Sequence, residues 1–230
     1  MKDNTLPELD TSNLWDRVYA LLKREIILRH YPPNEKLSLE KIADQLKVSR
    51  TPVRDALNRL EMDGLVVTRS KVGTFVVPID MDIVNEVMDS RLMIERWVAE
   101  KLEAGPGESV REQISIMENL HLSTINTAAM APEKYHEYDF NLQFHLAFVR
   151  LGGNDRNVKI YRDLMNYSLP ATIPGKVASG EVEQAIMQHG LILKALKEQD
   201  YPLLKTVIQR HLEDSKQTIL AKIEVNGGQI

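Results

Sequence analysis

The sequence predicts a mainly α-helical protein: an N-terminal winged helix-turn-helix, followed by an antiparallel bundle of about six helices. Two short helical patterns joined by a few residues, then two short β-rich runs, occupy the first 78 residues. From residue 79 onward the apolar residues follow a helical period and no strand pattern is visible. We therefore expect a winged helix-turn-helix domain over 1–78, a helical domain over 79–225 and a disordered, glycine-rich tail over 226–230.

Composition narrows the class of protein. With 230 residues and 43% hydrophobic content, the chain is long enough for real cores. No apolar run approaches the roughly 18 residues that a membrane span needs, and the polar start over 1–11 lacks a signal-peptide core, so we expect a cytoplasmic protein without a membrane partner. There is no cysteine, so any metal must use histidine, carboxylate or amide ligands. A net charge of −4 argues against non-specific coating of nucleic acid, although the part up to Pro78 is positive.

Apolar spacing, capping residues and turn signals predict the elements of the first domain. Helices are expected over Asn13–Arg29 after a Ser12 cap, over Leu39–Leu46 after a Ser38 cap and over Ser49–Met62, and strands over Leu65–Arg69 and Thr74–Pro78. The tight turn at Lys47-Val48 makes the second and third helices a helix-turn-helix pair, and the two strands form a hairpin wing.

The third helix has one apolar face and one basic face. Ser49 is its expected N-cap, and Pro52 falls in the first turn, where a missing N–H breaks no helical bond. Arg50 and Arg54 recur at a spacing of four residues on another face of the helix. Two arginines at the exposed start of a short anchored helix favour contacts with DNA phosphates and base edges.

The runs V-S-R-T-P-V-R-D-A-L (48–57) and L-E-M-D-G-L-V (60–66) resemble the winged-helix domain of the GntR family of bacterial transcription regulators. The resemblance covers Asn13–Val77. It implies that the chain binds double-stranded operator DNA. The residues that it implies as DNA contacts are Ser49, Arg50, Thr51, Arg54, Arg59 and, at the wing, Gly73. Where the family often has a second wing glycine, this chain has Lys71.

Helix signals continue through the rest of the chain. The expected order is a helix to about Glu103, a second opened by the capping box Ser109-x-x-Glu112, a third from Ala131-Pro132 to Gly152-Gly153, a fourth over Asp155–Tyr167, a loop over Leu169–Ala178, and two last helices after Ser179 and Asp200.

Three histidines and an asparagine are spaced as a metal site would require. His189 lies 11 residues before Asp200 and His211 lies 11 after it, so a hairpin at Asp200 brings them level. Asn141 and His145 lie four apart on one helix face. Three imidazoles and an oxygen suit a borderline divalent ion, Zn²⁺ or Ni²⁺. The alternative is that these are hydrogen-bonded core or surface histidines, which is how we interpret His30, His121 and His136.

The segments N-L-Q-F-H (141–145), G-G-N (152–154) and Q-H-G-L-I (188–192), with His211-Leu212, resemble the all-helical FCD effector domain of the FadR-type branch of that family. This resemblance implies a metal held by three histidines and an acidic residue or asparagine, beside a small carboxylate effector. Asn141 stands where many members have aspartate. Arg91 matches a frequent arginine and is the implied effector contact; the alternative is an internal salt bridge to Glu95.

Together these features predict a ligand-responsive transcription regulator that binds a palindromic operator as a homodimer. A second hypothesis is a metal-dependent enzyme acting on a small carboxylic acid, because three histidines can form a Lewis-acid site. No H-E-x-x-H motif or carboxylate pair accompanies the histidines, which counts against it. A third hypothesis is an architectural DNA-binding protein, but this hypothesis leaves the larger domain without a role.

Overall fold

The computed structural model describes residues 12–105, 107, 110–130, 140–168 and 179–230. The chain divides into two compact units, Met1–Pro78 and Ile79–Ile230. The predicted fold class is confirmed: a small winged-helix unit with a short sheet precedes an all-helical bundle.

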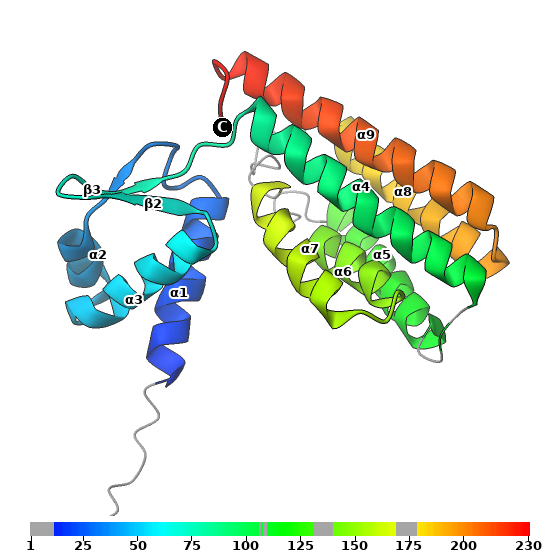
Figure 1. The fold of residues 1–230 in the computed structure, drawn as a ribbon, viewed down its shortest axis with the longest axis horizontal. Coiled ribbons are helices and arrows are strands. Elements are labelled where there is room, and N and C mark those ends of the chain that lie inside the picture. The colour runs from blue at the N-terminus through cyan, green and yellow to red at the C-terminus, as the bar shows by residue number, and fades with distance from the viewer. Residues whose placement is uncertain (1–11, 106, 108–109, 131–139, 169–178) are drawn as a thin grey trace, which may run out of the picture. The chain divides into compact units, whose positions relative to one another are not determined.

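Over residues 12–78, the first unit contains three helices and a three-stranded antiparallel sheet (Figure 1). Its elements are α1 (Ser12–Ile27), β1 (Lys36–Leu37), α2 (Leu39–Leu46), α3 (Arg50–Met62), β2 (Val66–Arg69) and β3 (Gly73–Val76). The strand order is β1-β3-β2. The sequence did not predict β1, whose two residues pair with Phe75 and Thr74 of β3.

Apolar faces of α1, α2, α3 and the sheet meet in one core. Val53, Ala56 and Leu60 of α3 are completely buried at its centre, as the helical spacing predicts. Ser38 caps α2 by accepting a hydrogen bond from the backbone N–H of Lys41. Ser49 occupies the N-cap position of α3, but its side chain makes no cap hydrogen bond, so the expected side-chain cap is absent there.

The wing is the hairpin of β2 and β3, closed where Arg69 pairs with Gly73. Lys71, in the turn, has a φ of +61°, a left-handed conformation that costs a side-chain-bearing residue energy. This explains why a glycine suits the position. Gly73 has a φ of +140°, and a Cβ there would lie 2.6 Å from Cε of Lys36, so no larger residue fits without movement.

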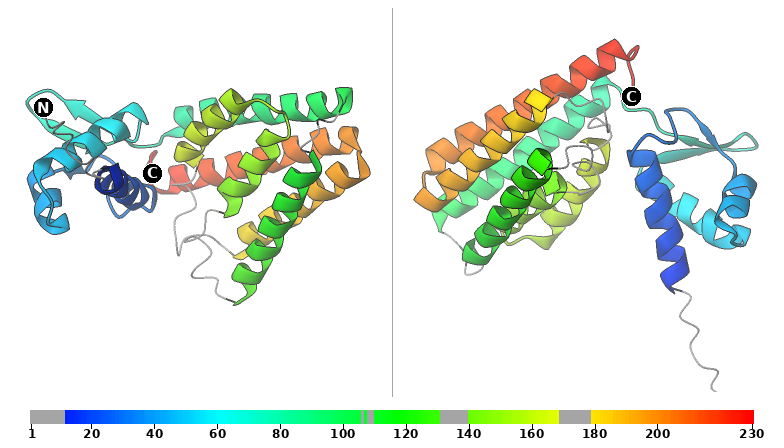
Figure 2. Two further views of the ribbon diagram at one scale, coloured as in Figure 1. Left: turned by 90° about the horizontal axis from the view of Figure 1, so that it is seen from below. Right: turned by 180° about the vertical axis from the view of Figure 1, so that it is seen from behind.

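The second unit is a bundle of antiparallel helices (Figures 1 and 2). Its helices are α4 (Met81–Ala104), α5 (Val110–Met130), α6 (Phe140–Arg150), α7 (Asp155–Ser168), α8 (Ser179–Glu198) and α9 (Tyr201–Val225). Asp80 and Asp200 cap α4 and α9 by accepting hydrogen bonds from backbone N–H groups. In both figures α4 and α9 lie side by side, and α4, α6, α8 and α9 all contribute to one apolar core.

Three of the expected helix and loop signals lie outside the described residues: the Ser109 capping box, the helix start at Ala131-Pro132 and the loop over Leu169–Ala178. The helix ends that are described differ from the expected ones by only a few residues.

The expectation of a disordered tail over Asn226–Ile230 is wrong. Ile230 and Ile79 exchange backbone hydrogen bonds of 2.8 and 2.9 Å, and the Ile230 side chain is buried. Gly227 and Gly228 have φ values of +81° and +96°. Their left-handed conformations turn the chain back after α9, so the glycines that suggested disorder instead form a turn.

Among the described residues, no helix has both the length and the apolar character to cross a membrane.

Candidate functional site

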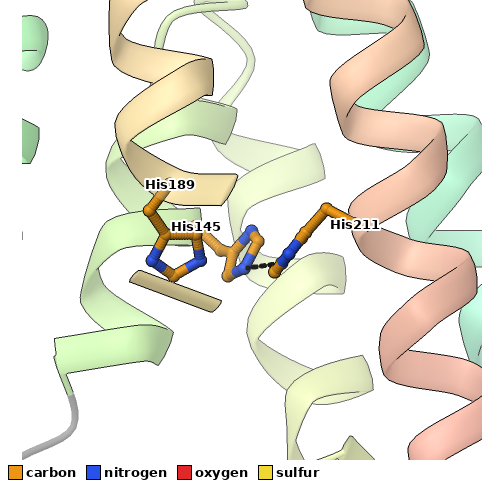
Figure 3. Close-up of side chains that lie close together, drawn as sticks. All are labelled: His145, His189 and His211. Atoms are coloured by element: carbon orange, nitrogen blue, oxygen red, sulfur yellow. Dashed lines mark hydrogen bonds between the residues drawn. The ribbon is translucent and has the colours of Figure 1, made fainter. Parts of the chain in front are cut away.

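Three histidines from three helices meet inside the bundle (Figure 3). His145 comes from α6, His189 from α8 and His211 from α9. One ring nitrogen from each lies within 4.8 Å of the others. The three side chains are buried, with exposed fractions of only 1 to 3%. The three imidazoles therefore face a common point that water does not freely reach.

Local sequence explains how each histidine reaches this point. On α6, every residue from Phe144 to Val149 is buried, which places His145 inside the bundle rather than at its edge. The Asp200-capped turn makes α8 and α9 a hairpin, and the rings of His189 and His211 lie 4.9 Å apart between centroids. The His189 ring also stacks on Phe144 at 4.1 Å, which limits its rotation.

The ring nitrogens of His145 and His211 have polar neighbours, whereas Nε2 of His189 is buried and has no hydrogen-bond partner among the described residues. Nε2 of His145 lies 3.1 Å from Nε2 of His211, and Nδ1 of His211 lies 2.9 Å from Oε1 of Gln188 (Figure 3 shows the first contact). Nδ1 of His145 lies 3.4 Å from a carboxylate oxygen of Glu95. Two Nε2 atoms at 3.1 Å can share one proton, or both can present lone pairs to a metal that replaces that proton.

Burial sets the charge of the histidines. It lowers the pKa of His145, although Glu95 partly opposes the change, and it lowers the pKa of His189 well below its usual value. The pKa of His211 falls to about 3, mainly through burial and also through repulsion from His145. The three rings are therefore neutral at pH 7, which is the form that binds metals.

A buried ion pair adjoins the histidines. Nη2 of Arg91 lies 3.5 Å from Glu95, and both residues hydrogen-bond the Tyr161 hydroxyl. Burial alone would raise the pKa of Glu95, but His145, Arg91 and Tyr161 together lower it to about 2, so the carboxylate is ionised. The internal salt bridge, one of the two expectations for Arg91, is present, and the guanidinium is almost fully buried.

The other predicted ligand and histidines are placed differently. Asn141 lies on α6 one turn before His145 and is partly exposed, unlike the three histidines. His121, which the sequence did not connect with the three, lies near them: its Nε2 would lie 3.4 Å from a Cβ at Gly190, directly after His189. The exposed His30 lies 2.7 Å from Glu25 in the first unit, and His136 lies outside the described residues.

Sequence reasoning missed three polar residues of the site: Tyr161, Gln188 and the role of Glu95. Glu95 was visible only as a partner four residues after Arg91, and Gln188 only as the neighbour of His189. No local signal marked Tyr161, because its contacts join segments 66 and 70 residues apart.

Four of the six predicted DNA-contacting residues lie at the start of α3, whereas Arg59 is in its last turn and Gly73 is in the wing. Ser49, Arg50, Thr51 and Arg54 are all exposed. Arg50 lies 3.7 Å from Glu40, a loose surface contact. Arg59 differs, because its guanidinium lies 2.8 Å from Asp16 and 4.0 Å above the Tyr19 ring. Arg59 therefore helps hold α1 against α3, and a DNA contact would have to compete with these partners.

A helix-turn-helix with an exposed basic helix and a wing, joined to a helical bundle that encloses a polar site, defines a DNA-binding transcription regulator. The family models agree. Residues 14–76 match the model described as "Bacterial regulatory proteins, gntR family", and residues 86–214 match the FCD domain. The chain belongs to the GntR family of transcription regulators, in the branch that carries an FCD domain.

Relatives of known name match most of this chain's length. The chain is 29% identical to the Uxu operon transcriptional regulator of Escherichia coli, over 90% of this chain and 86% of that protein. It is 27% identical to the Exu regulon transcriptional regulator of the same organism, over 88% of this chain and 83% of that protein. A putative GntR regulator from Rhodococcus has the same fold, with a TM-score of 0.73, 23% identity and coverage of 92% and 99%. Because the families and relatives are transcription regulators, the enzyme hypothesis is set aside.

Proposed function

We propose that this regulator binds a palindromic operator as a homodimer in the cytoplasm, and that its bundle holds a divalent metal beside a small carboxylate effector. Effector binding would change the affinity of the protein for DNA. The observation that carries the effector half of the proposal is the set of three buried, neutral histidines whose nitrogens face one point.

The donor set fits a metal. His145, His189 and His211 would each give one imidazole nitrogen, and Asn141, one turn from His145, would give an amide oxygen. Imidazoles suit Zn²⁺ or Ni²⁺, and the missing anionic ligand leaves the bound metal with its full positive charge. A carboxylate that completed the coordination shell would offset this charge in a buried setting, which supports a carboxylate effector.

Arg91 has a defined place in this proposal. Its guanidinium is bonded to Tyr161 and paired with Glu95, so an effector carboxylate could bind it only by sharing or displacing Glu95. We therefore assign Arg91 first to holding Glu95 beside His145, and second to an effector contact that forms if the pair rearranges.

DNA binding is assigned to the exposed start of α3 and to the wing. Arg50 and Arg54 would contact base edges or phosphates, with Ser49 and Thr51 beside them, while Lys71 adds a positive charge at the wing turn. The effector can alter this binding only by the difference in its own affinity for the DNA-bound and free states.

The first experiment measures metal in untagged protein purified without chelator, for the wild type, His189→Ala and the control His30→Ala. We expect bound metal in the wild type and in the control, whose histidine is exposed in the other unit, and loss in His189→Ala. Binding of DNA from upstream of the gene is then measured by fluorescence anisotropy, with and without a panel of small carboxylates and sugar acids. His189→Ala should still bind DNA but lose the response. Absence of metal from the wild type would return the histidines to the core interpretation.

A further inference from the structure

A side-chain relay runs from the centre of the bundle toward solvent. Nδ1 of His211 contacts Oε1 of Gln188 at 2.9 Å, and Nε2 of Gln188 donates to Oδ2 of Asp214 at 2.6 Å. His211 and Gln188 are buried, whereas the Asp214 side chain is 34% exposed. The relay therefore connects a buried imidazole to a carboxylate that reaches the surface.

The chemistry of Asp214 fixes the orientation of the amide. An ionised carboxylate can only accept hydrogen bonds, so the Gln188 atom that faces it must be the NH₂ group. The opposite end of the amide, Oε1, then faces His211 and can only accept. His211 must consequently carry its proton on Nδ1, and its Nε2 is left with a lone pair.

That lone pair points toward the metal centre, because Nε2 of His211 lies 3.1 Å from Nε2 of His145. We propose that Gln188 is a positioning residue for the metal centre: oriented by Asp214, it holds His211 in the tautomer whose Nε2 can bind a metal. The inference rests on the metal centre proposed above, and it deepens that proposal by assigning the residues that prepare one ligand. Outer-shell partners of this kind typically change metal affinity 10- to 100-fold.

The chain provides a matched control. Gln184, one turn earlier on α8, also donates to Oδ2 of Asp214, at 2.9 Å, but this hydrogen bond does not involve His211. Gln184→Leu and Gln188→Leu remove the same chemical group from the same helix, and both take a donor away from Asp214. Only Gln188→Leu removes the acceptor that faces His211.

The relay also predicts a rescue. In Gln188→Glu a carboxylate can still accept from His211, but it faces the Asp214 carboxylate at a distance where the two repel. In Asp214→Asn the Gln188 amide is free to turn over and present its NH₂ group to His211, which favours the wrong tautomer. The double variant Gln188→Glu/Asp214→Asn exchanges carboxylate and amide, so each contact again has one donor and one acceptor.

Two measurements test the proposal. Competition between the protein and a chelator for Zn²⁺ gives the metal affinity, and ¹⁵N NMR of the histidine rings in metal-free protein gives the His211 tautomer. We expect Gln188→Leu to bind Zn²⁺ about 10- to 100-fold more weakly, with His211 moving toward the Nε2-protonated form, while Gln184→Leu stays near wild type. Asp214→Asn and Gln188→Glu should each weaken binding, and the double variant should recover most of it.

The outcomes separate the two proposals. If the wild type binds no Zn²⁺, the proposal of a metal centre is refuted. The His211 tautomer, measured in metal-free protein, then still decides whether Gln188 determines which ring nitrogen of His211 carries the proton. If the wild type binds Zn²⁺ and Gln188→Leu matches it in affinity and tautomer, the metal centre stands and the positioning role is overturned. Weaker binding in Gln188→Leu without rescue in the double variant would also overturn it, since lost packing would then explain the effect.

Discussion

Acid should destabilise the metal-free bundle through its buried histidines. His211 has a pKa of about 3 in the folded protein, against about 6.5 in an unfolded chain. Because the folded pKa is lowered, the unfolded state binds the proton first as the pH falls. The neutral ring therefore makes its full contribution to the free energy of unfolding above pH 6.5. This contribution is lost progressively as the pH falls below 6.5. Each pH unit costs about 1.4 kcal/mol, so His211 alone should remove about 2 kcal/mol between pH 6.5 and 5.

The assay is urea unfolding of chelator-treated protein at several values between about pH 7.5 and 5, followed by circular dichroism. His145 and His189 shift in the same direction and should add to the loss. His211→Gln removes one titrating group, so about one proton fewer is taken up on unfolding. The free energy of unfolding of this variant should therefore fall less steeply with acid than that of the wild type. The control His30→Gln changes an exposed side chain in the other unit and should follow the wild type. A wild-type stability that stays constant over this range would refute the reasoning.

Three further predictions concern the DNA-binding surface and the tail. Arg54→Ala should reduce discrimination between operator and altered sequences by about 1–3 kcal/mol in anisotropy titrations, without changing the unfolding midpoint, because the side chain is exposed. Lys71→Gly should stabilise the first unit by about 1 kcal/mol, because Lys71 has a φ of +61°. It should also reduce the salt dependence of DNA binding by the amount that corresponds to about one phosphate contact. Lys71→Ala should reduce the salt dependence in the same way but should not stabilise the unit. Ile230→Asp should destabilise the bundle by about 2–3 kcal/mol in thermal unfolding, because the side chain is buried beside Ile79; a melting temperature equal to that of the wild type would contradict the packing of the tail.

Local sequence predicted the elements whose signals are local. The helix-turn-helix and its wing follow from apolar spacing, the Ser38 cap and a turn, and these elements appear in the structure, although the Ser49 side-chain cap does not. The strand Lys36–Leu37 could not be predicted, because two residues carry no periodicity and their pairing with Phe75 and Thr74 is long-range. The tail was misjudged because Gly227 and Gly228 serve equally well in a disordered segment and in a left-handed turn, and only the burial of Ile230 distinguishes them.

Part of the candidate site could be predicted because two of its histidines lie at equal distances along the sequence from one turn. His189 and His211 lie equally far from the turn at Asp200, so a helical hairpin alone brings them together. The position of His121 beside Gly190 depends on how α5 packs against α8, which no spacing within one helix can reveal. The same limit hid Tyr161, whose role depends on packing between α4 and α7.

The charges around the histidines lead to one more consequence of the proposed function. Arg91 and Glu95 neutralise each other, and the three imidazoles are neutral, so an added divalent metal brings two uncompensated positive charges into a buried site. Asn141, in place of an acidic residue, supplies no negative charge to offset them. The metal should therefore raise the affinity for a carboxylate, and the carboxylate should raise the affinity for the metal by the same factor, because the coupling between two ligands is reciprocal. Asn141→Asp supplies one negative charge in advance, so it should strengthen metal binding by itself and weaken this coupling.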